Sequence, residues 1–357
     1  MLLAAAEADP ADVEAHLAIY EVAQLLRRPE LALEHQRQAI ALAPVHSTPA
    51  SVAEDYALLV PCVPGPFTAN TPVDLLFDTT RVTIHRWYVD PMVAPPPLPP
   101  HDAVFVAAGE STAAQPALRL LQSLFAESPA PVFNDPAEIA KLGRVTFAET
   151  FAGAQRSRTA RTVRLPRVRY AAEGYALPHI VRPVDSHGGH GLVRITSDVE
   201  RAAFLAEYDD AEVYVSDYLD YASRDGYFRK YRIIFVDGEP WPFHLAISSN
   251  WMVHYYNAAM AEHQWMRDEE HAFLADIGSV FSGELAEALR ETARLLPLDY
   301  VGIDCGIDRD GTLVLFEADN ALIVHVLDDP AVYGYKHVYV PRILHAVDAM
   351  VRRRIRP

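Results

Sequence analysis

The sequence has few cysteines, fewer cationic than anionic residues, and no long apolar run. Its two cysteines, Cys62 and Cys305, stand far apart, and the chain does not begin with a basic segment followed by an apolar one. Both features argue against secretion, so we expect a reducing cytoplasm. No apolar run approaches the length that spans a bilayer. The formal net charge of -17 argues against a general binder of nucleic acid or membrane surfaces, but it allows a local basic pocket for phosphate.

The composition is that of a soluble globular protein. Half of the 357 residues are apolar and 22% are charged. This length is sufficient for two or three domains with sizeable cores. Strand and helix patterns alternate over about 70 residues, which predicts an α/β arrangement for that part of the chain.

Residues 300–326, YVGIDCGIDRDGTLVLFEADNALIVHV, predict two strands joined by a two-residue turn at Asp310-Gly311. This turn places Asp304 directly opposite Glu317, and the period of a strand puts Asp319 on the same face. Opposed carboxylates repel, so something positive should lie between them. Three acidic oxygen donors suit a hard divalent cation such as Mg²⁺.

The alternative for this face is a solvated acidic surface on a chain that is acidic overall. Leu313 and Leu315, which the two-residue turn places on the same face, favour partial burial instead.

Residues 11–43 predict two amphipathic helices with a break at Arg28-Pro29. The pattern AxEHQRQAIALAP, with Ala32, Ala39 and Pro44, resembles the second helix of a tetratricopeptide repeat. One such repeat cannot bury its own face. We expect it to pack on the following domain or on a second subunit, which would make the protein a homodimer.

The next segments alternate between strand and helix signals. Proline-rich residues 44–72 predict a linker, and Asn134-Asp135-Pro136 is a helix-start signal. Strands are predicted at 75–77, 82–87, 103–107 and 132–133, with a helix at 115–125. This order predicts a small βαβ domain with a parallel sheet. The arginine-rich stretch 156–169 is mostly a solvated connection, although its last residues alternate like a strand.

Strands at 179–181 and 192–195 flank the loop 185–191, which contains three glycines. Without Cβ atoms, such a tip can bring backbone N–H groups against phosphate oxygens. His187 and His190 on this tip are assigned to solvent or phosphate and not to a metal.

Two cations and a group of pocket residues follow. The strand 227–236 projects Lys230 and Arg232 to one face, where their partner is either a nearby carboxylate or a nucleotide phosphate. The aromatic segment 248–257 suits packing or the wall of a substrate pocket. Position alone makes four further residues pocket candidates: His244, Trp251, His254 and Lys336.

The order of these parts over residues 70–345 resembles the ATP-grasp superfamily, which includes D-alanine ligases and glutathione synthetase. Asn134-Asp135-Pro136 with Lys141 and Arg144 is similar to the family's NxPxxI…K segment, where a basic residue meets the α-phosphate. HIVRP at 179–183 is similar to PVVVKP, and the glycine-rich tip is similar to the loop that closes on the triphosphate.

The resemblance implies a fold and a division into domains. It implies an ATP-grasp fold of two α+β subdomains at 173–350, preceded by a βαβ pre-ATP-grasp domain at 70–172 and the helical hairpin at 1–45. The lid subdomain would occupy 173–215, and the metal-binding subdomain 216–350.

The resemblance also implies site residues. The strand 213–219 would become a hinge that pairs with adenine, and Asp225 would hold the ribose. The implied nucleotide-binding residues are Arg144, Arg182, His187, Gly188, Gly189, Asp217, Tyr218, Leu219, Asp225 and Lys230. The implied catalytic residues are Arg182, Lys230 and Arg232, and the implied metal ligands are Asp304, Glu317, Asp319 and Asn320. Arg182 replaces the usual Lys, and Asp319 replaces the usual Asn, so either Asp319 or Asn320 is the third ligand.

The function expected from this resemblance is an ATP-dependent ligase that joins a carboxylate to an amine through an acyl phosphate. The substrates would be small molecules or peptides, with two Mg²⁺ ions for which Mn²⁺ can substitute. Two alternatives stay open: a phosphotransferase acting on a small molecule, and a degenerate fold that serves as a scaffold or binding protein.

Overall fold

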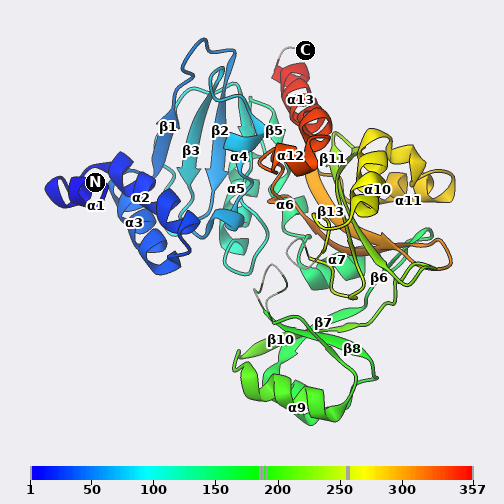
Figure 1. Cartoon of the computed structure of the whole chain (residues 1–357). Coiled ribbons are helices and arrows are strands. Elements are labelled where there is room, and N and C mark those ends of the chain that lie inside the picture. Colours follow the sequence, from blue (N-terminus) through cyan, green and yellow to red (C-terminus); the bar gives the residue numbers. More distant parts are fainter. Residues whose placement is uncertain (1, 185, 187–188, 190, 255–257, 356–357) are drawn as a thin grey trace.

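The computed structural model describes residues 2–184, 186, 189, 191–254 and 258–355 (Figure 1). Within these residues the chain is a mixed α/β protein with three sheets. The first and third sheets share two buried apolar clusters, and the second sheet has a cluster of its own. Among the described residues, no helix is long and apolar enough to cross a membrane.

The chain begins with three helices: α1 (Leu2–Ala8), α2 (Val13–Leu25) and α3 (Pro29–Leu42). The predicted pair and its break are confirmed, since Arg27 has a φ of 55° and Pro29 begins α3. The sequence does not predict α1. The pair packs on the following domain, where the Tyr20 hydroxyl donates to the Gly65 carbonyl (3.0 Å) and the Gly65 N–H donates to Gln36 (2.9 Å). Its likeness to a tetratricopeptide repeat stays a prediction.

The first sheet has the order β1-β3-β2-β4-β5, parallel except for β1. Its strands are β1 (Val45–Thr48), β2 (Tyr56–Cys62), β3 (Val82–Tyr88), β4 (Ala103–Phe105) and β5 (Val132–Phe133). The predicted βαβ pattern with a parallel sheet is confirmed. The sheet begins at Val45, well before residue 70.

The predicted linker at 44–72 is wrong, because it contains the fully buried strand β2 between two parallel neighbours. The prolines favour a linker, yet Pro61 lies within β2, where its carbonyl accepts from the N–H groups of Ala107 and Ala108 (3.0 and 3.1 Å). The predicted strand at 75–77 is also wrong, since α4 (Val73–Leu76) occupies that segment.

Short helices connect the first sheet to the rest. After η1 (Phe67–Ala69) come α5 (Gln115–Phe125), α6 (Pro136–Ile139) and α7 (Arg144–Thr150). The apolar spacing of α5 predicts its bounds correctly. Asp135 caps α6, as the helix-start signal predicts: its carboxylate accepts the Ala137 N–H (2.8 Å).

The second sheet is antiparallel, has the order β7-β10-β8-β9, and lies below the other two in Figure 1. Its strands are β7 (Thr162–Pro166), β8 (His179–Pro183), β9 (Val193–Ile195) and β10 (Glu212–Asp217). Helices α8 (Arg167–Ala172) and α9 (Asp198–Glu207) accompany it, and Tyr170, Val181 and Phe204 are in its core. The sheet therefore includes a strand that precedes residue 173.

The third sheet has the order β12-β11-β13-β14-β6. Its strands are β6 (Ser157–Thr159), β11 (Phe228–Val236), β12 (Glu239–Ser248), β13 (Tyr300–Ile307) and β14 (Leu313–Asp319). The helical segments after β12 are α10 (Gln264–Ala275), η2 (Ile277–Ser279), α11 (Glu284–Leu295), α12 (Pro330–Tyr333) and α13 (Lys336–Ile355).

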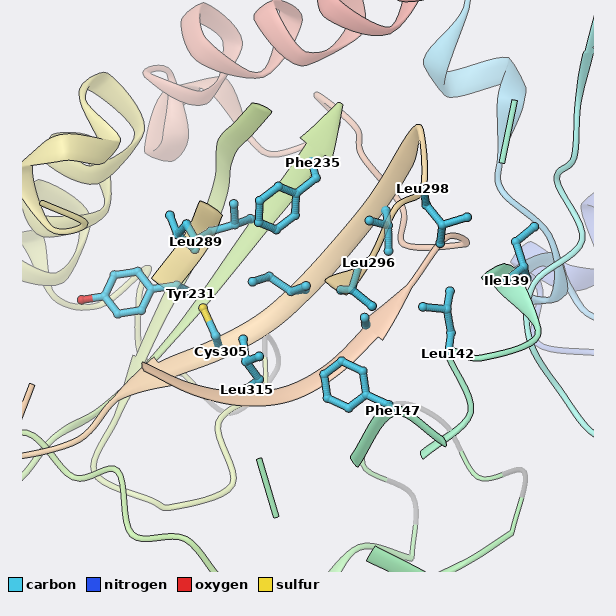
Figure 2. Close-up of a cluster of buried hydrophobic side chains, with 14 of the residues drawn as sticks. Ile139, Leu142, Phe147, Tyr231, Phe235, Leu289, Leu296, Leu298, Cys305 and Leu315 are labelled. Carbon is cyan, nitrogen blue, oxygen red and sulfur yellow. The ribbon is translucent and has the colours of Figure 1, made fainter. Parts of the chain in front are cut away.

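Figure 2 shows the apolar face of the third sheet. Tyr231, Cys305 and Leu315 on its strands join Leu289 of α11 and Phe147 of α7 in one buried cluster. Helices therefore cover this face of the sheet. The opposite face carries Lys230 and Arg232 at one end of β11 and the apolar Ile234 and Val236 at the other.

The hairpin of β13 and β14 reaches the predicted pairing by a different route. Its turn is longer than two residues: the Asp308 N–H donates to the Thr312 carbonyl (3.1 Å), and Gly311 has a φ of 82°. Cys305 pairs with Leu315, and a bulge then restores the pairing of Asp304 with Glu317. The bulge also reverses the faces, so Leu313 and Leu315 point into the helix-covered core and the prediction that they share the acidic face is wrong.

Candidate functional site

Four directly paired residues form a row across the third sheet. Glu317 of β14 pairs with Asp304 of β13, Asp304 pairs with Arg232 of β11, and Arg232 pairs with His244 of β12. Directly opposed residues on antiparallel strands have their side chains on the same face. The row therefore runs from two carboxylates through a guanidinium to an imidazole.

Asp304 is bound by the two cations that the sequence places on one strand face. It is 1% exposed, and its Oδ2 lies 2.9 Å from Lys230 Nζ, while the Arg232 Nε and Nη2 atoms lie 2.7 and 2.9 Å from Oδ1 and Oδ2. Burial alone would raise the pKa of Asp304, but Arg232 and Lys230 hold it well below its usual range. The prediction of a positive group beside the opposed carboxylates is confirmed.

Glu317 has a cation of its own. Arg144, the first residue of α7, places Nη2 2.9 Å from Glu317 Oε2. Burial opposes ionisation of Glu317, yet Arg144 lowers its pKa overall. Arg182 of β8 is near the same carboxylate: burial and Arg144 lower the pKa of Arg182 to about 10, and Glu317 acts against them. The Arg182 guanidinium donates to the Ser186 hydroxyl (2.9 Å) and to the Ser186 carbonyl.

Asp319 is the third carboxylate on this face. Its Oδ1 accepts the Ala321 N–H at 2.7 Å, and among the described residues it has no recorded ion pair. Burial, with a smaller contribution from Glu317, raises the pKa of Asp319 to about 6. Asn320 instead faces the first sheet, where its Nδ2 donates to the Ala108 carbonyl at 3.0 Å. Asp319 therefore lies on the face of the other two carboxylates, and the Asn320 amide nitrogen is bound at the first sheet.

Whether a divalent cation fits at Asp304, Glu317 and Asp319 depends on where their carboxylate oxygens lie in the structure. The described part of the chain contains no group of three or more His, Cys, Asp or Glu side chains arranged around one ion. The donor set nevertheless suits Mg²⁺, because three carboxylates share a face and half-buried Asp319 has no ion pair with any described residue. For an ion to enter, Lys230, Arg232 and Arg144 would have to release these carboxylates.

The remaining residues of the predicted nucleotide site are more dispersed. Asp217 is the last residue of β10, and Tyr218 accepts from Arg194 (3.1 Å) while Leu219 packs in a separate apolar cluster. Asp225 binds Arg229 (2.9 Å), which also binds Glu269, so its carboxylate is part of a different ion-pair group from the row. Lys141 pairs with Glu138 on the surface (2.6 Å).

The glycine-rich tip is described in part. Gly189 and Gly191 have φ values of 79° and 64°, which favour glycine, and a Cβ on Gly191 would lie 2.6 Å from Pro183 Cδ. The predicted contacts of His187, Gly188 and His190 lie outside the described residues.

A buried polar cluster, which we call the Glu270 cluster, adjoins the imidazole end of the row. It consists of Glu270 of α10, His244, Tyr335 and Lys336. Glu270 is fully buried, with Oε1 2.5 Å from His244 Nδ1 and 3.3 Å from Lys336 Nζ, and Oε2 2.6 Å from the Tyr335 hydroxyl. Burial opposes its ionisation, but His244, Lys336 and Tyr335 lower the pKa of Glu270 to about 2.

The sequence predicts two members of this cluster, His244 and Lys336, from position alone, and it misses Glu270. A signal was present: Met266, Glu270, Phe273 and Leu274 are the buried residues of α10, so Glu270 is a lone acid on an apolar helical stripe. Two of the chain's three lysines, Lys230 and Lys336, lie in this site. His254 lies near the row, because Lys230 and Arg232 contribute, after burial, to lowering its pKa. Trp251 lies beside Arg194, 5.6 Å from its guanidinium.

Comparison with known proteins finds similarity among solved structures. No family model and no curated protein matches the chain. A D-alanine–D-alanine ligase from Bacillus anthracis complexed with ATP is 13% identical, with 84% of this chain and 97% of that chain covered and a TM-score of 0.48. The VanG D-Ala:D-Ser ligase from Enterococcus faecalis is also 13% identical, with 84% and 99% covered and a TM-score of 0.48.

A third solved structure is the RimK domain ATP-grasp protein from Sphaerobacter thermophilus. It is 12% identical, with 82% of this chain and 99% of that chain covered and a TM-score of 0.45. Identities and TM-scores this low do not assign a function.

Proposed function

We propose that this protein is an ATP-dependent ligase that joins a carboxylate to an amine through an acyl phosphate, releasing ADP and phosphate. The observation that carries the proposal is the row of Glu317, Asp304 and Arg232, with Lys230 and Arg144 bound to its carboxylates. A surface in which carboxylates and cations alternate can bind a metal and a polyphosphate together. The order of motifs along the sequence supports the same function.

The carboxylates would hold the metal. Asp304, Glu317 and Asp319 would bind two Mg²⁺ ions, for which Mn²⁺ can substitute, and Asn320 is the weaker candidate because it faces the first sheet. Bound there, the ions would neutralise charge on the β- and γ-phosphates.

The cations would act on the phosphates. Lys230, Arg232 and Arg144 would contact phosphate oxygens, together with Arg182 of the second sheet, which lies near Glu317. The substrate carboxylate attacks the γ-phosphorus, and ADP leaves with the electron pair of the broken bond. These side chains would stabilise the charge that develops during this transfer.

The nucleotide would lie between the second and third sheets. Asp217, Tyr218 and Leu219 follow one another at the end of β10, as a hinge beside adenine would require. His187, Gly188 and Gly189 would cover the phosphates. Asp225 is the weakest assignment, since Arg229 binds it in the structure. The division into a helical hairpin, a βαβ domain and an ATP-grasp domain, the cytoplasmic location and the homodimer remain predictions.

The test is a screen of pooled amino acids and small peptides with ATP and Mg²⁺, read by mass spectrometry for condensed product and by ADP release. We expect Asp304→Asn and Glu317→Gln to lower ADP release at least about 100-fold, the usual effect of losing one preorganised electrostatic group. Glu287→Gln, in a surface pair with Arg290, is the matched control and should retain activity.

Three results would contradict the proposal. Full ATP turnover by both carboxylate variants would remove the metal assignment. A phosphorylated substrate without free phosphate would identify a phosphotransferase. Failure of the folded protein to bind Mg-ATP in calorimetry would identify a scaffold or binding protein.

A further inference from the structure

The Glu270 cluster has a feature that phosphate binding does not require. It places a neutral imidazole, fixed by a buried carboxylate, at the end of the row of charges. His244 is the direct cross-strand partner of Arg232, and Arg232 is the partner of Asp304. Two strand spacings separate His244 from Asp304, which is about 10 Å. Arg232 lies between them, so it connects the carboxylate end of the row to the imidazole end.

The hydrogen bonds define which nitrogen of His244 carries the proton. Glu270 is ionised and can only accept, so His244 Nδ1, at 2.5 Å from Oε1, donates to it. In the neutral ring the lone pair is then on Nε2, which makes Nε2 the basic atom. The Leu245 N–H (3.1 Å) and the Tyr335 hydroxyl (2.6 Å) also donate to Glu270, so the carboxylate is held from several sides.

The charges around His244 keep it neutral near pH 7. Burial lowers its pKa most, Glu270 opposes this effect, and Lys336 and Arg232 lower the pKa further. Lys336 Nζ lies 3.2 Å from His244 Nδ1 and 3.6 Å from Asp328 Oδ1, so Asp328 is a further charge facing the cluster. A neutral imidazole in such surroundings can accept a proton, and a charged one could not.

We propose that His244, oriented by Glu270, is the general base that deprotonates the amine substrate of this ligase. The assignment rests on the proposed function, in which an amine attacks an acyl phosphate. The amine nitrogen forms a bond to the acyl carbon and its proton moves to His244 Nε2. The bond between the acyl carbon and the phosphate oxygen breaks, and phosphate leaves with the electron pair. Glu270 is a positioning residue, which fixes the ring and stabilises the imidazolium.

The decisive variant is His244→Asn, tested with two acceptors. The amino-acid pool supplies the carboxylate, and the acceptor is either an amino acid, whose amine is protonated near pH 7, or hydroxylamine, which is already neutral. We expect His244→Asn to lower condensed product about 100-fold or more, because a positioned base contributes about 10²- to 10⁴-fold. Hydroxamate formation should stay within about threefold of wild type, because it needs no base.

The outcomes separate the base from a structural role. Equal losses with both acceptors, or no loss with either, would overturn the assignment. A wild-type protein that releases no ADP with either acceptor would overturn the proposed function and this assignment with it. His271→Asn is the matched control. His271 is exposed on α10, the helix of Glu270, and lies beside Tyr335. Its variant should condense amino acids at the wild-type rate.

Glu270→Gln tests the positioning role by its pH profile. In wild type, condensation should rise with pH as His244 loses its proton and then reach a plateau. Glu270 raises the pKa of His244, so its removal should move this rise to lower pH and reduce the plateau. An unchanged midpoint in a variant with wild-type circular dichroism would contradict the positioning role.

Discussion

Replacing Asp304 by Asn should destabilise the protein strongly, because it removes the buried negative charge that two cations contact through three hydrogen bonds. Asp304 is 1% exposed and accepts three hydrogen bonds from Lys230 and Arg232. Breaking a buried ion pair by removing one partner costs about 3–5 kcal/mol. The Lys230 and Arg232 side chains are 18% and 25% exposed, so they can reach water in part. We therefore expect a loss near the lower end, about 3 kcal/mol.

The assay is urea denaturation at pH 7 in chelator, followed by tryptophan fluorescence and circular dichroism. Glu287→Gln is the control, because its partner Arg290 is 57% exposed and surface pairs contribute about 0–1 kcal/mol. The effect of Asp304→Asn also has a pH signature. Because the folded pKa of Asp304 is depressed, its contribution is complete above the unfolded value near 4 and is lost as pH falls below it. An Asp304→Asn midpoint no lower than that of the control would refute the role of Asp304 as the buried counter-ion.

Two further substitutions test the surroundings of the site. Asp319→Asn should raise the free energy of unfolding in metal-free buffer above pH 6, because the raised pKa of Asp319 means that its ionisation destabilises the folded state. This gain should vanish below the ordinary pKa of 3.8, where the carboxyl is protonated in both states. Equal gains in urea midpoint at pH 8 and pH 3.5 would contradict this. Gly306→Ala should lower the free energy of unfolding by about 1–3 kcal/mol, because the new Cβ would lie 2.6 Å from Tyr221 Cδ2. Gly174→Ala is the control and should be neutral, because nothing lies within 4 Å of its Cβ position. Equal midpoints of the two variants in thermal denaturation would contradict close packing at Gly306.

The pairing of cations with carboxylates explains how this site remains stable without a ligand. Buried carboxylates on adjacent strands would repel one another if they were bare. Lys230, Arg232 and Arg144 satisfy two of them in the structure, and the same three cations are suited to phosphate. Under the proposed function, metal and nucleotide would replace these ion pairs with new ones.

Local spacing in the sequence determined which side chains share a face. It predicted helix α5 over residues 115–125 and the common face of Lys230 and Arg232. These follow from the helical and strand periods, which depend on covalent geometry and not on the rest of the fold. The apolar pattern of the hairpin likewise indicated two strands.

Tertiary packing decided what those faces meet. Buried strand β2 exists despite Pro61 because β3 and β4 pair with it on both sides, which no local signal reveals. The bulge in β14 turned Leu315 into the core, and the contact with Ala108 directed Asn320 away from the carboxylates. Glu270 joined His244 only when α10 packed on β12, because the interaction of side chains 26 positions apart depends on how helix and sheet are brought together.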